Sequence, residues 1–114
     1  MSVAAVVTLK PGTAPPSGFP PAGYLPLATQ ALFDGYWLPT AENAGLDLIV
    51  QFRSGVDVLP TQIPQIRAEL ETFAERVVVA VSPAQAGHIT ERVARLRDLL
   101  DGLDPDSVEE IFIG

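Results

Sequence analysis

Cysteine is absent from the sequence, and histidine occurs once in 114 residues. Without cysteine, the chain has no disulfide, no thiolate metal ligand and no cysteine nucleophile. A single histidine leaves zinc and iron without the nitrogen ligands that they prefer in proteins. We therefore expect neither a metal site nor a cofactor site.

The usual sequence motifs of catalysis are also missing. Neither a glycine-rich phosphate loop nor a G-x-S-x-G sequence occurs. The one histidine, His88, is followed by Arg92 and Arg95 at helical spacing, and no nucleophile or orienting group lies near it in the sequence. We therefore predict a surface histidine and a protein that is not an enzyme. An enzyme that uses carboxylates, arginines and hydroxyl groups alone stays open as an alternative.

Long apolar runs and positive charge are both scarce. Residues 1–10 contain a short apolar run with no basic residue before it, whereas a membrane span needs about 20 apolar residues. We interpret this segment as the first strand and expect a soluble, cytoplasmic protein with no membrane contact. The chain has 14 acidic and 7 basic residues, for a net charge of −7. Nucleic acid is therefore an unfavourable partner, and a basic protein is a favourable one.

The composition indicates one globular domain over 1–114. A hydrophobic fraction of 47% and a charged fraction of 18% suit a chain that buries a core of its own. Residues 11–26 contain six prolines and three glycines, which exclude a helix or a central strand. We predict a structural loop there, with Phe19 and Tyr24 holding it against the body of the domain.

The stretch 25–44 gives mixed signals. Pro26 suits a first helical turn, and the apolar residues after it favour a helix, which the following glycine and Pro39 would interrupt. Thr40 is then expected to cap a second short helical turn that ends at Gly45.

Alternating side chains predict a hairpin in the middle of the chain. In 46–53, one apolar set alternates with a mostly polar set that includes Ile49, with the period of a half-buried strand: Leu46, Leu48, Val50 and Phe52 against Asp47, Ile49, Gln51 and Arg53. Ser54 and Gly55 can turn the chain, and the alternation resumes in 56–58. We therefore predict two paired strands.

Two further segments have strand character. Residues 77–81 form a β-branched run that is either a buried strand or the continuation of the preceding helix. In 109–114, Ile111 and Ile113 share one face, opposite Phe112. This alternation predicts a final strand.

Two amphipathic helices are predicted. The first spans 63–77, with Thr61 as its N-cap and Glu69 on its polar face. The second begins at Ser82, which precedes a proline and has glutamine at the capping-box spacing, and it ends at Gly102. Their apolar stripes comprise Ile63, Ile66, Leu70, Phe73 and Val77, and then Ala86, Ile89, Val93, Leu96, Leu100 and Leu103. We predict an α+β fold, a layered sandwich of two or three such helices on a mixed or antiparallel sheet of four to five short strands.

Six carboxylates fall within 98–110 with no basic residue between them. They are Asp98, Asp101, Asp104, Asp106, Glu109 and Glu110. Their order does not match an EF-hand loop, so we do not interpret them as a calcium site. They form either an acidic surface that steers a basic partner or a solvated helix end. Tyr36 and Trp37 either pack in the core, where helices meet, or are further candidate contact residues.

The order of several segments resembles small acidic bacterial immunity proteins, the inhibitors in toxin–immunity pairs. These segments are Tyr36–Pro39, Gly45-Leu46 before a predicted strand, Glu69-Leu70 in an amphipathic helix, and Glu110–Gly114 at the end. The resemblance implies a cytoplasmic, non-enzymatic inhibitor of a cognate toxin. It transfers no contact residue, because such families vary most where they touch the toxin.

We therefore predict a protein-binding domain that contacts a basic partner through the six carboxylates together with Tyr36 and Trp37. A small-molecule-binding or regulatory α/β domain, oligomeric and with a pocket between sheet and helices, is the alternative. A deep apolar cavity would favour the alternative, and a solid core would count against it.

Overall fold

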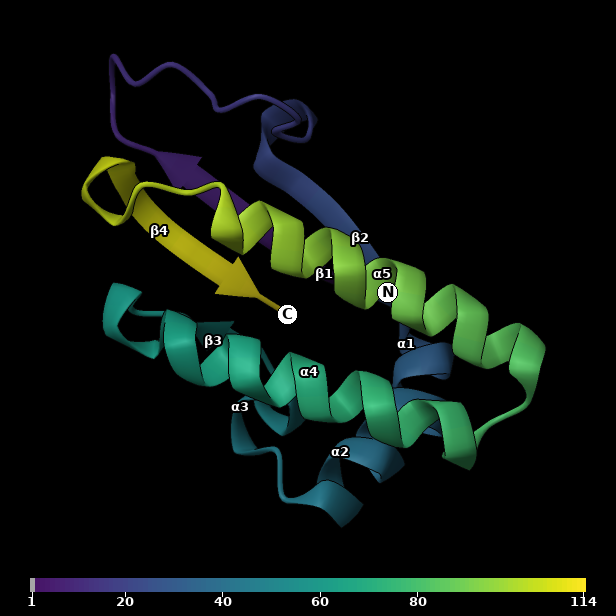
Figure 1. Ribbon diagram of the computed structural model, residues 1–114. Helices are drawn as coiled ribbons and strands as arrows, with labels where there is room; N and C mark the ends of the chain where they lie inside the picture. The colour runs from purple at the N-terminus through teal and green to yellow at the C-terminus, as the bar shows by residue number, and fades with distance from the viewer. Residues whose placement is uncertain (1) are drawn as a thin grey trace.

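The computed structural model describes residues 2–114, which adopt the predicted α+β fold. Four antiparallel strands form one sheet in the order β2-β1-β4-β3. Two long helices lie side by side over one face of this sheet (Figure 1). The strands are β1 (Ser2–Leu9), β2 (Tyr24–Thr29), β3 (Val56–Asp57) and β4 (Val108–Ile113), and the long helices are α4 (Ile63–Ala80) and α5 (Pro83–Asp101).

Alternation along the strands separates the two faces of the sheet. The face beneath the helices carries the buried side chains Val3, Ala5, Val7, Leu25, Leu27, Ile111 and Ile113. These residues meet across the strands, with Ala5 opposite both Leu25 and Ile113. The predicted first and last strands are thus confirmed, and they pair with each other at the centre of the sheet.

The apolar stripes of α4 and α5 are confirmed, because every predicted stripe residue is buried. Helix α4 continues to Ala80, so 77–81 extends the helix and the strand interpretation is wrong. Val77 completes the buried stripe, whereas Val78 and Val79 leave it and are 58% and 85% exposed. Nothing interrupts the helix before this run, and the helix-propensity cost of valine is too small to end it.

The roles that the sequence pattern predicts for two polar residues near α4 are wrong. Thr61 lies inside the 3-10 turn η3 (Pro60–Gln62) and is not the N-cap of the helix. Glu69 is buried rather than on the polar face, with 8% of its surface exposed. Its Oε1 accepts the N–H groups of Leu48 at 3.0 Å and Ile49 at 3.1 Å, so it caps another helix from a distance.

The helix capped in this way replaces the predicted strand at 46–53. It is α3 (Asp47–Gln51), and Leu48, Ile49 and Phe52 are buried on its inner side at helical spacing. The hairpin is therefore wrong, since β3 pairs with β4 near the end of the chain. A run this short satisfies both the strand and the helix period, and the remote carboxylate cap decides between them.

The chain from 30 to 44 is one continuous helical stretch that packs against α4. It consists of α1 (Gln30–Leu32), the π-helical turn η2 (Phe33–Trp37) and α2 (Leu38–Ala44). Pro39 has no N–H to donate, and the wider π turn accommodates it without a break. Thr40 caps no second helix, because its Oγ1 instead donates to the Tyr36 carbonyl at 2.9 Å. The predicted end is confirmed at Gly45, which adopts a left-handed φ of 70°.

The proline-rich loop predicted over 11–26 is confirmed over 11–23, which include the 3-10 turn η1 (Pro21–Gly23), and it is wrong for 24–26, which belong to β2. The chain then enters β2, so the helical turn predicted at Pro26 is wrong. Proline is tolerated there because β2 is an edge strand. Gly23 lies so close to β1 that a Cβ on it would collide with the Val7 carbonyl oxygen, which fixes the end of the loop on the sheet.

Ser82→Ala is expected to lower the free energy of unfolding by about 1 kcal/mol. The Ser82 Oγ accepts the Gln85 N–H at 3.4 Å at the start of α5, and alanine offers no acceptor. Chemical denaturation followed by circular dichroism measures the change. Ser82→Asp keeps an acceptor and should retain most of the stability, so equal losses in the two variants would contradict the capping role.

Candidate functional site

The six predicted carboxylates are all exposed. They follow the chain from the last turn of α5, through the 3-10 turn η4 (Pro105–Ser107), into β4. A helix C-terminus favours positive side chains, yet the last turn of α5 contains no basic residue. The acidic character of this end of the domain is therefore not explained by the needs of the helix.

Two of the six carboxylates have clear structural partners. Asp101 Oδ1 lies 2.8 Å from Arg67 Nε and links α5 to α4. Asp104 accepts the Asp106 N–H at 3.1 Å and the Ser107 hydroxyl at 3.3 Å, which holds the turn η4. Within residues 2–114, the other four carboxylates make no ion pair and accept no hydrogen bond: Asp98, Asp106, Glu109 and Glu110. These four are available to a partner.

Tyr36 and Trp37 lie in another part of the molecule. The turn η2 lies between α1 and α2, whereas η4 and the start of β4 lie at the opposite, left-hand end of the domain in Figure 1. Trp37 is 1% exposed and stacks between Phe33 and Phe73, with ring centroids 5.8 Å and 4.8 Å away. Trp37 therefore belongs to the core, and the half-buried Tyr36 lies beside it. The structure does not bring this aromatic pair to the acidic residues.

A different pair of aromatic residues is exposed on the outer face of the sheet, opposite α4 and α5. Val6 of β1 pairs with Tyr24 on one side and with Phe112 on the other, and Phe112 pairs with Asp57. These four residues form one row across all four strands, which we call the outer row. Tyr24 is 46% exposed and Phe112 is 36% exposed. The acidic Glu110 precedes Phe112 by two residues and lies on the same face of β4.

The sequence alone predicts the exposure of one of the two aromatic residues in this row. The alternation in 109–114 places Phe112 opposite the buried isoleucines, so an exposed aromatic follows once the inner face is known. Tyr24 is predicted only as a loop anchor, because nothing local indicates that β2 begins there. Pairing of both residues with Val6 depends on strand order, which no local pattern reveals.

The Phe112 ring is held over two glycines. A Cβ added to Gly55, which has a φ of +97°, would come within 2.7 Å of this ring, and one added to Gly114 would come within 2.9 Å. The ring therefore rests on bare backbone at the junction of β3 and β4. A fixed aromatic side chain loses little further conformational entropy when a partner covers it.

A groove of about 380 Å³ adjoins the outer row beside β4. Its apolar walls include Leu59, Pro60 and Ile111. Asp57, Glu109 and Glu110 also line it, and no basic residue does. Three carboxylates beside an exposed aromatic row thus make a surface that combines apolar area with negative charge.

A second groove, of about 500 Å³, lies between the proline-rich loop and α5. Phe19, Leu25 and Leu99 line it together with Arg95 and Asp98. It is partly open to solvent, and the start of β2, the loop and the second half of α5 form its walls.

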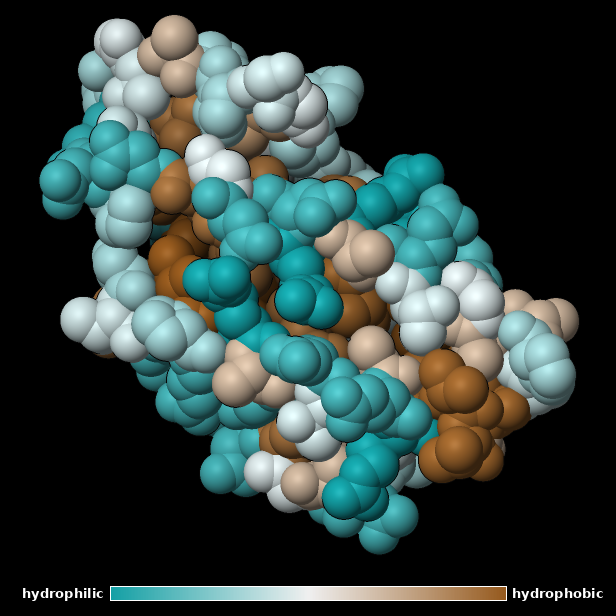
Figure 2. All heavy atoms as spheres, in the orientation of Figure 1, coloured by the Kyte–Doolittle hydropathy of each residue, from teal (hydrophilic) through white to brown (hydrophobic). Residues whose placement is uncertain are grey.

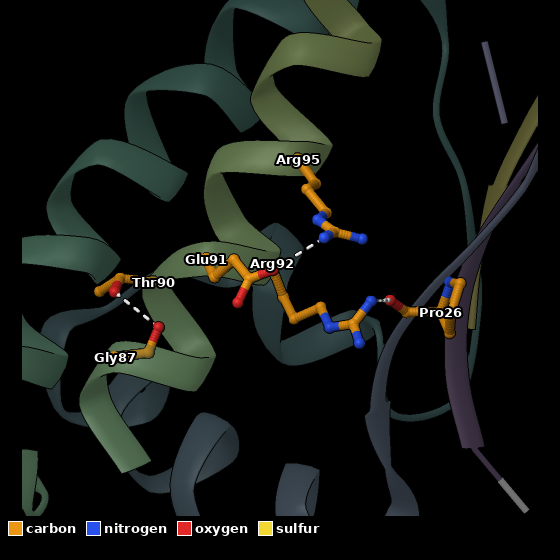
Figure 3. A network of polar contacts seen from close by, with 6 residues as sticks. All are labelled: Pro26, Gly87, Thr90, Glu91, Arg92 and Arg95. Atoms are coloured by element: carbon orange, nitrogen blue, oxygen red, sulfur yellow. Dashed lines mark hydrogen bonds and ion pairs between the residues drawn. The ribbon is translucent and has the colours of Figure 1, made fainter. Parts of the chain in front are cut away.

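The basic side chains on α5 near this groove are already engaged, as Figure 3 shows. Arg95 Nη2 lies 2.8 Å from Glu91 Oε1, and Arg92 Nη1 donates to the Pro26 carbonyl of β2 at 3.4 Å. His88 is exposed on the same helix, as predicted.

The helix-covered side of the molecule presents mostly hydrophilic residues, with an apolar patch at the end of α4 (Figure 2). Val78 and Val79 account for this patch. The exposed Glu75 and Arg76 lie one turn earlier on α4, so this patch adjoins one charge of each sign, whereas only acidic charges line the groove beside the outer row.

Within the described chain, no three histidine, aspartate or glutamate side chains are placed to share a metal ion. Over the same residues, none of the helices combines the length and apolarity needed to cross a bilayer. Comparisons with protein families, with curated proteins and with solved structures found no match to this chain.

Proposed function

We propose that this chain is a non-enzymatic protein-binding domain that engages a basic partner through the outer row and the acidic residues of the groove beside it, Asp57, Glu109 and Glu110. The observation that carries the proposal is the row itself, in which two exposed aromatic residues flank Val6 and end at Asp57. Aromatic residues with a fixed position supply much of the binding energy at protein interfaces.

Charge supports a basic partner. The chain has a net charge of −7. Four carboxylates that make no ion pair and accept no hydrogen bond within residues 2–114 follow one another from the end of α5 into β4: Asp98, Asp106, Glu109 and Glu110. Opposite charge on a partner would speed encounter and fix its orientation, while burial of the aromatic row would slow dissociation. Raised salt should therefore reduce the association rate more than it raises the dissociation rate.

The finer form of the proposal follows from the resemblance to immunity proteins. In that form, the partner is a toxin encoded beside this chain, and binding occludes a basic surface of that toxin. The proposed contact set then changes, because Tyr36 and Trp37 lie away from the acidic residues and give way to Tyr24 and Phe112.

The small-molecule alternative would use the groove between the proline-rich loop and α5. Its volume of about 500 Å³ falls within the range of ligand pockets. However, the groove is open, and its arginine is already paired with Glu91. The outer row therefore supports protein binding better than this groove supports a small ligand.

Phe112→Lys is expected to weaken binding to the product of the adjacent gene by about thirtyfold or more, the effect of losing an interface hot spot. The matched control is Val79→Lys, which makes a comparable apolar-to-lysine change in the patch at the end of α4 and should leave the affinity unchanged. Titration calorimetry with the co-expressed and purified partner measures both. The proposal is wrong if no complex forms, or if Val79→Lys weakens binding as much as Phe112→Lys does.

A further inference from the structure

The two edges of the sheet differ in whether a further strand can pair with them. At the β2 edge, Pro26 has no N–H to offer a neighbouring strand, and Arg92 occupies its carbonyl at 3.4 Å (Figure 3). Proline and a covering charged side chain are two devices by which proteins keep an edge strand from pairing. The β2 edge is therefore closed to a further strand.

The opposite edge is left open because β3 is short. Val56 and Asp57 pair with Ile113 and Phe112, and the Val58 N–H still donates to the Ile111 carbonyl at 2.8 Å. If this register continued, Pro60 would face Glu109 with no N–H to donate. The chain instead turns away from β4.

Gln62 holds that turn. Its side-chain oxygen accepts the Leu59 N–H at 2.9 Å, which fixes the chain in the turn that leads into α4. Upstream of Ile111, no strand of the described chain therefore lies beside β4 on this side. The groove of about 380 Å³ occupies that place, with Leu59, 58% exposed, in its wall.

Glu109 marks the centre of this open edge. Thr8 pairs with Glu110 and Leu9 pairs with Val108, so a bulge leaves Glu109 without a partner on β1. It has no partner on β3 either. Like charges directly opposite each other destabilise a strand pair. A second copy aligned antiparallel along this edge would bring glutamates together, and each chain carries a net charge of −7.

We infer that the open edge of β4 receives an extended segment of the basic partner as a fifth strand. This inference rests on the proposed function and specifies how the partner binds. Backbone hydrogen bonds to an exposed edge supply affinity in such strand addition, and alternate side chains supply specificity. Cationic side chains of the segment lie on the face of Glu110 and Asp57, and apolar side chains alternate with them. The exposed Leu59 bounds the groove in which the segment lies.

The probe is an end-blocked octapeptide of alternating arginine and valine, titrated into the full chain and followed by NMR. The amides of Ile111, Glu109 and Leu59 are expected to shift, and the Ile111 amide should exchange more slowly with solvent. An octapeptide of alternating glutamate and valine should not bind. Equal binding of the two peptides, or shifts centred on β2, would overturn the inference.

Two modified peptides distinguish binding by electrostatic attraction alone from binding by strand pairing. Each carries N-methyl groups on one alternate set of residues, so one of them loses the hydrogen bonds that face β4. Strand addition predicts that this one peptide fails to bind and that the other keeps the parent affinity. If both bind like the parent, the contact is electrostatic and the inference is wrong.

A matched pair of charge-reversal variants locates the site. The double substitution Glu109→Lys and Glu110→Lys should lower the affinity for the arginine–valine peptide by about tenfold or more. Glu71→Lys with Glu75→Lys makes the same change in net charge on the exposed face of α4, and this variant should bind normally. Equal weakening would contradict a site at β4. With the natural partner, a complex that leaves the Ile111 amide unprotected refutes strand addition alone, whereas absence of any complex refutes the proposed function.

Discussion

Trp37→Ala is expected to lower the free energy of unfolding by about 3–5 kcal/mol, the cost of truncating a fully buried aromatic side chain. Trp37 lies between the rings of Phe33 and Phe73, at centroid distances of 5.8 Å and 4.8 Å, where α4 meets the helical stretch 30–44. Its removal leaves a cavity at the contact between these two parts and also removes both aromatic contacts. Urea denaturation should be followed by circular dichroism, because the variant lacks the sole tryptophan.

The neighbouring Tyr36→Ala is the control for this prediction. Tyr36 is half-buried, and its side chain makes no aromatic stack within residues 2–114. We expect a loss of about 1–2 kcal/mol, in the usual range for a partly buried residue. Equal losses at the two positions would contradict the assignment of Trp37 to the core, and would return it to the set of candidate contact residues.

Glu69→Ala is expected to cost about 3 kcal/mol, because it leaves two buried N–H groups without an acceptor and removes charged hydrogen bonds. The carboxylate accepts from Leu48 and Ile49 through Oε1, and from the Gln65 side chain through Oε2 at 2.9 Å. Global stability is measured by denaturation, and the local effect by hydrogen exchange at the Leu48 and Ile49 amides. In the variant, the exchange rates of these two amides should rise by more than the loss of global stability explains.

Two substitutions bracket the Glu69 prediction. Glu69→Gln keeps one oxygen for the two backbone donors but loses the charge, so an intermediate loss of about 1–2 kcal/mol is expected. Glu71→Ala, at an exposed position two residues along α4, should change stability by less than about 0.5 kcal/mol. A neutral Glu69→Ala variant would show that α3 does not depend on the remote cap.

Local sequence patterns are sufficient for some elements of this fold and insufficient for others. The three–four repeats in 63–77 and 86–103 predict α4 and α5, because a long apolar stripe has one geometric solution. The segment 46–53 is different, because its helix is capped by a carboxylate about twenty residues away in the sequence. Pro39 likewise predicts a break in the helix, and only the π turn before it shows how the helix continues.

The candidate site divides in the same way. Exposure of the acidic residues follows from their charge, and the sequence alone predicts it. The outer row does not follow, because Tyr24 and Phe112 are far apart in the sequence and meet Val6 through the strand order β2-β1-β4. For Trp37, the residue type leaves both an interface and the core open, and packing against Phe73 of α4 places the side chain in the core.

The most direct test of the account is amide hydrogen exchange of the domain, free and in complex with its basic partner. We predict that protection on binding is concentrated in β4 and in 56–59, which together form the end of the outer row and the open edge. Protection confined to the end of α4 around Val78 and Val79, or to the loop 16–20 with the facing part of α5, would contradict binding through the sheet.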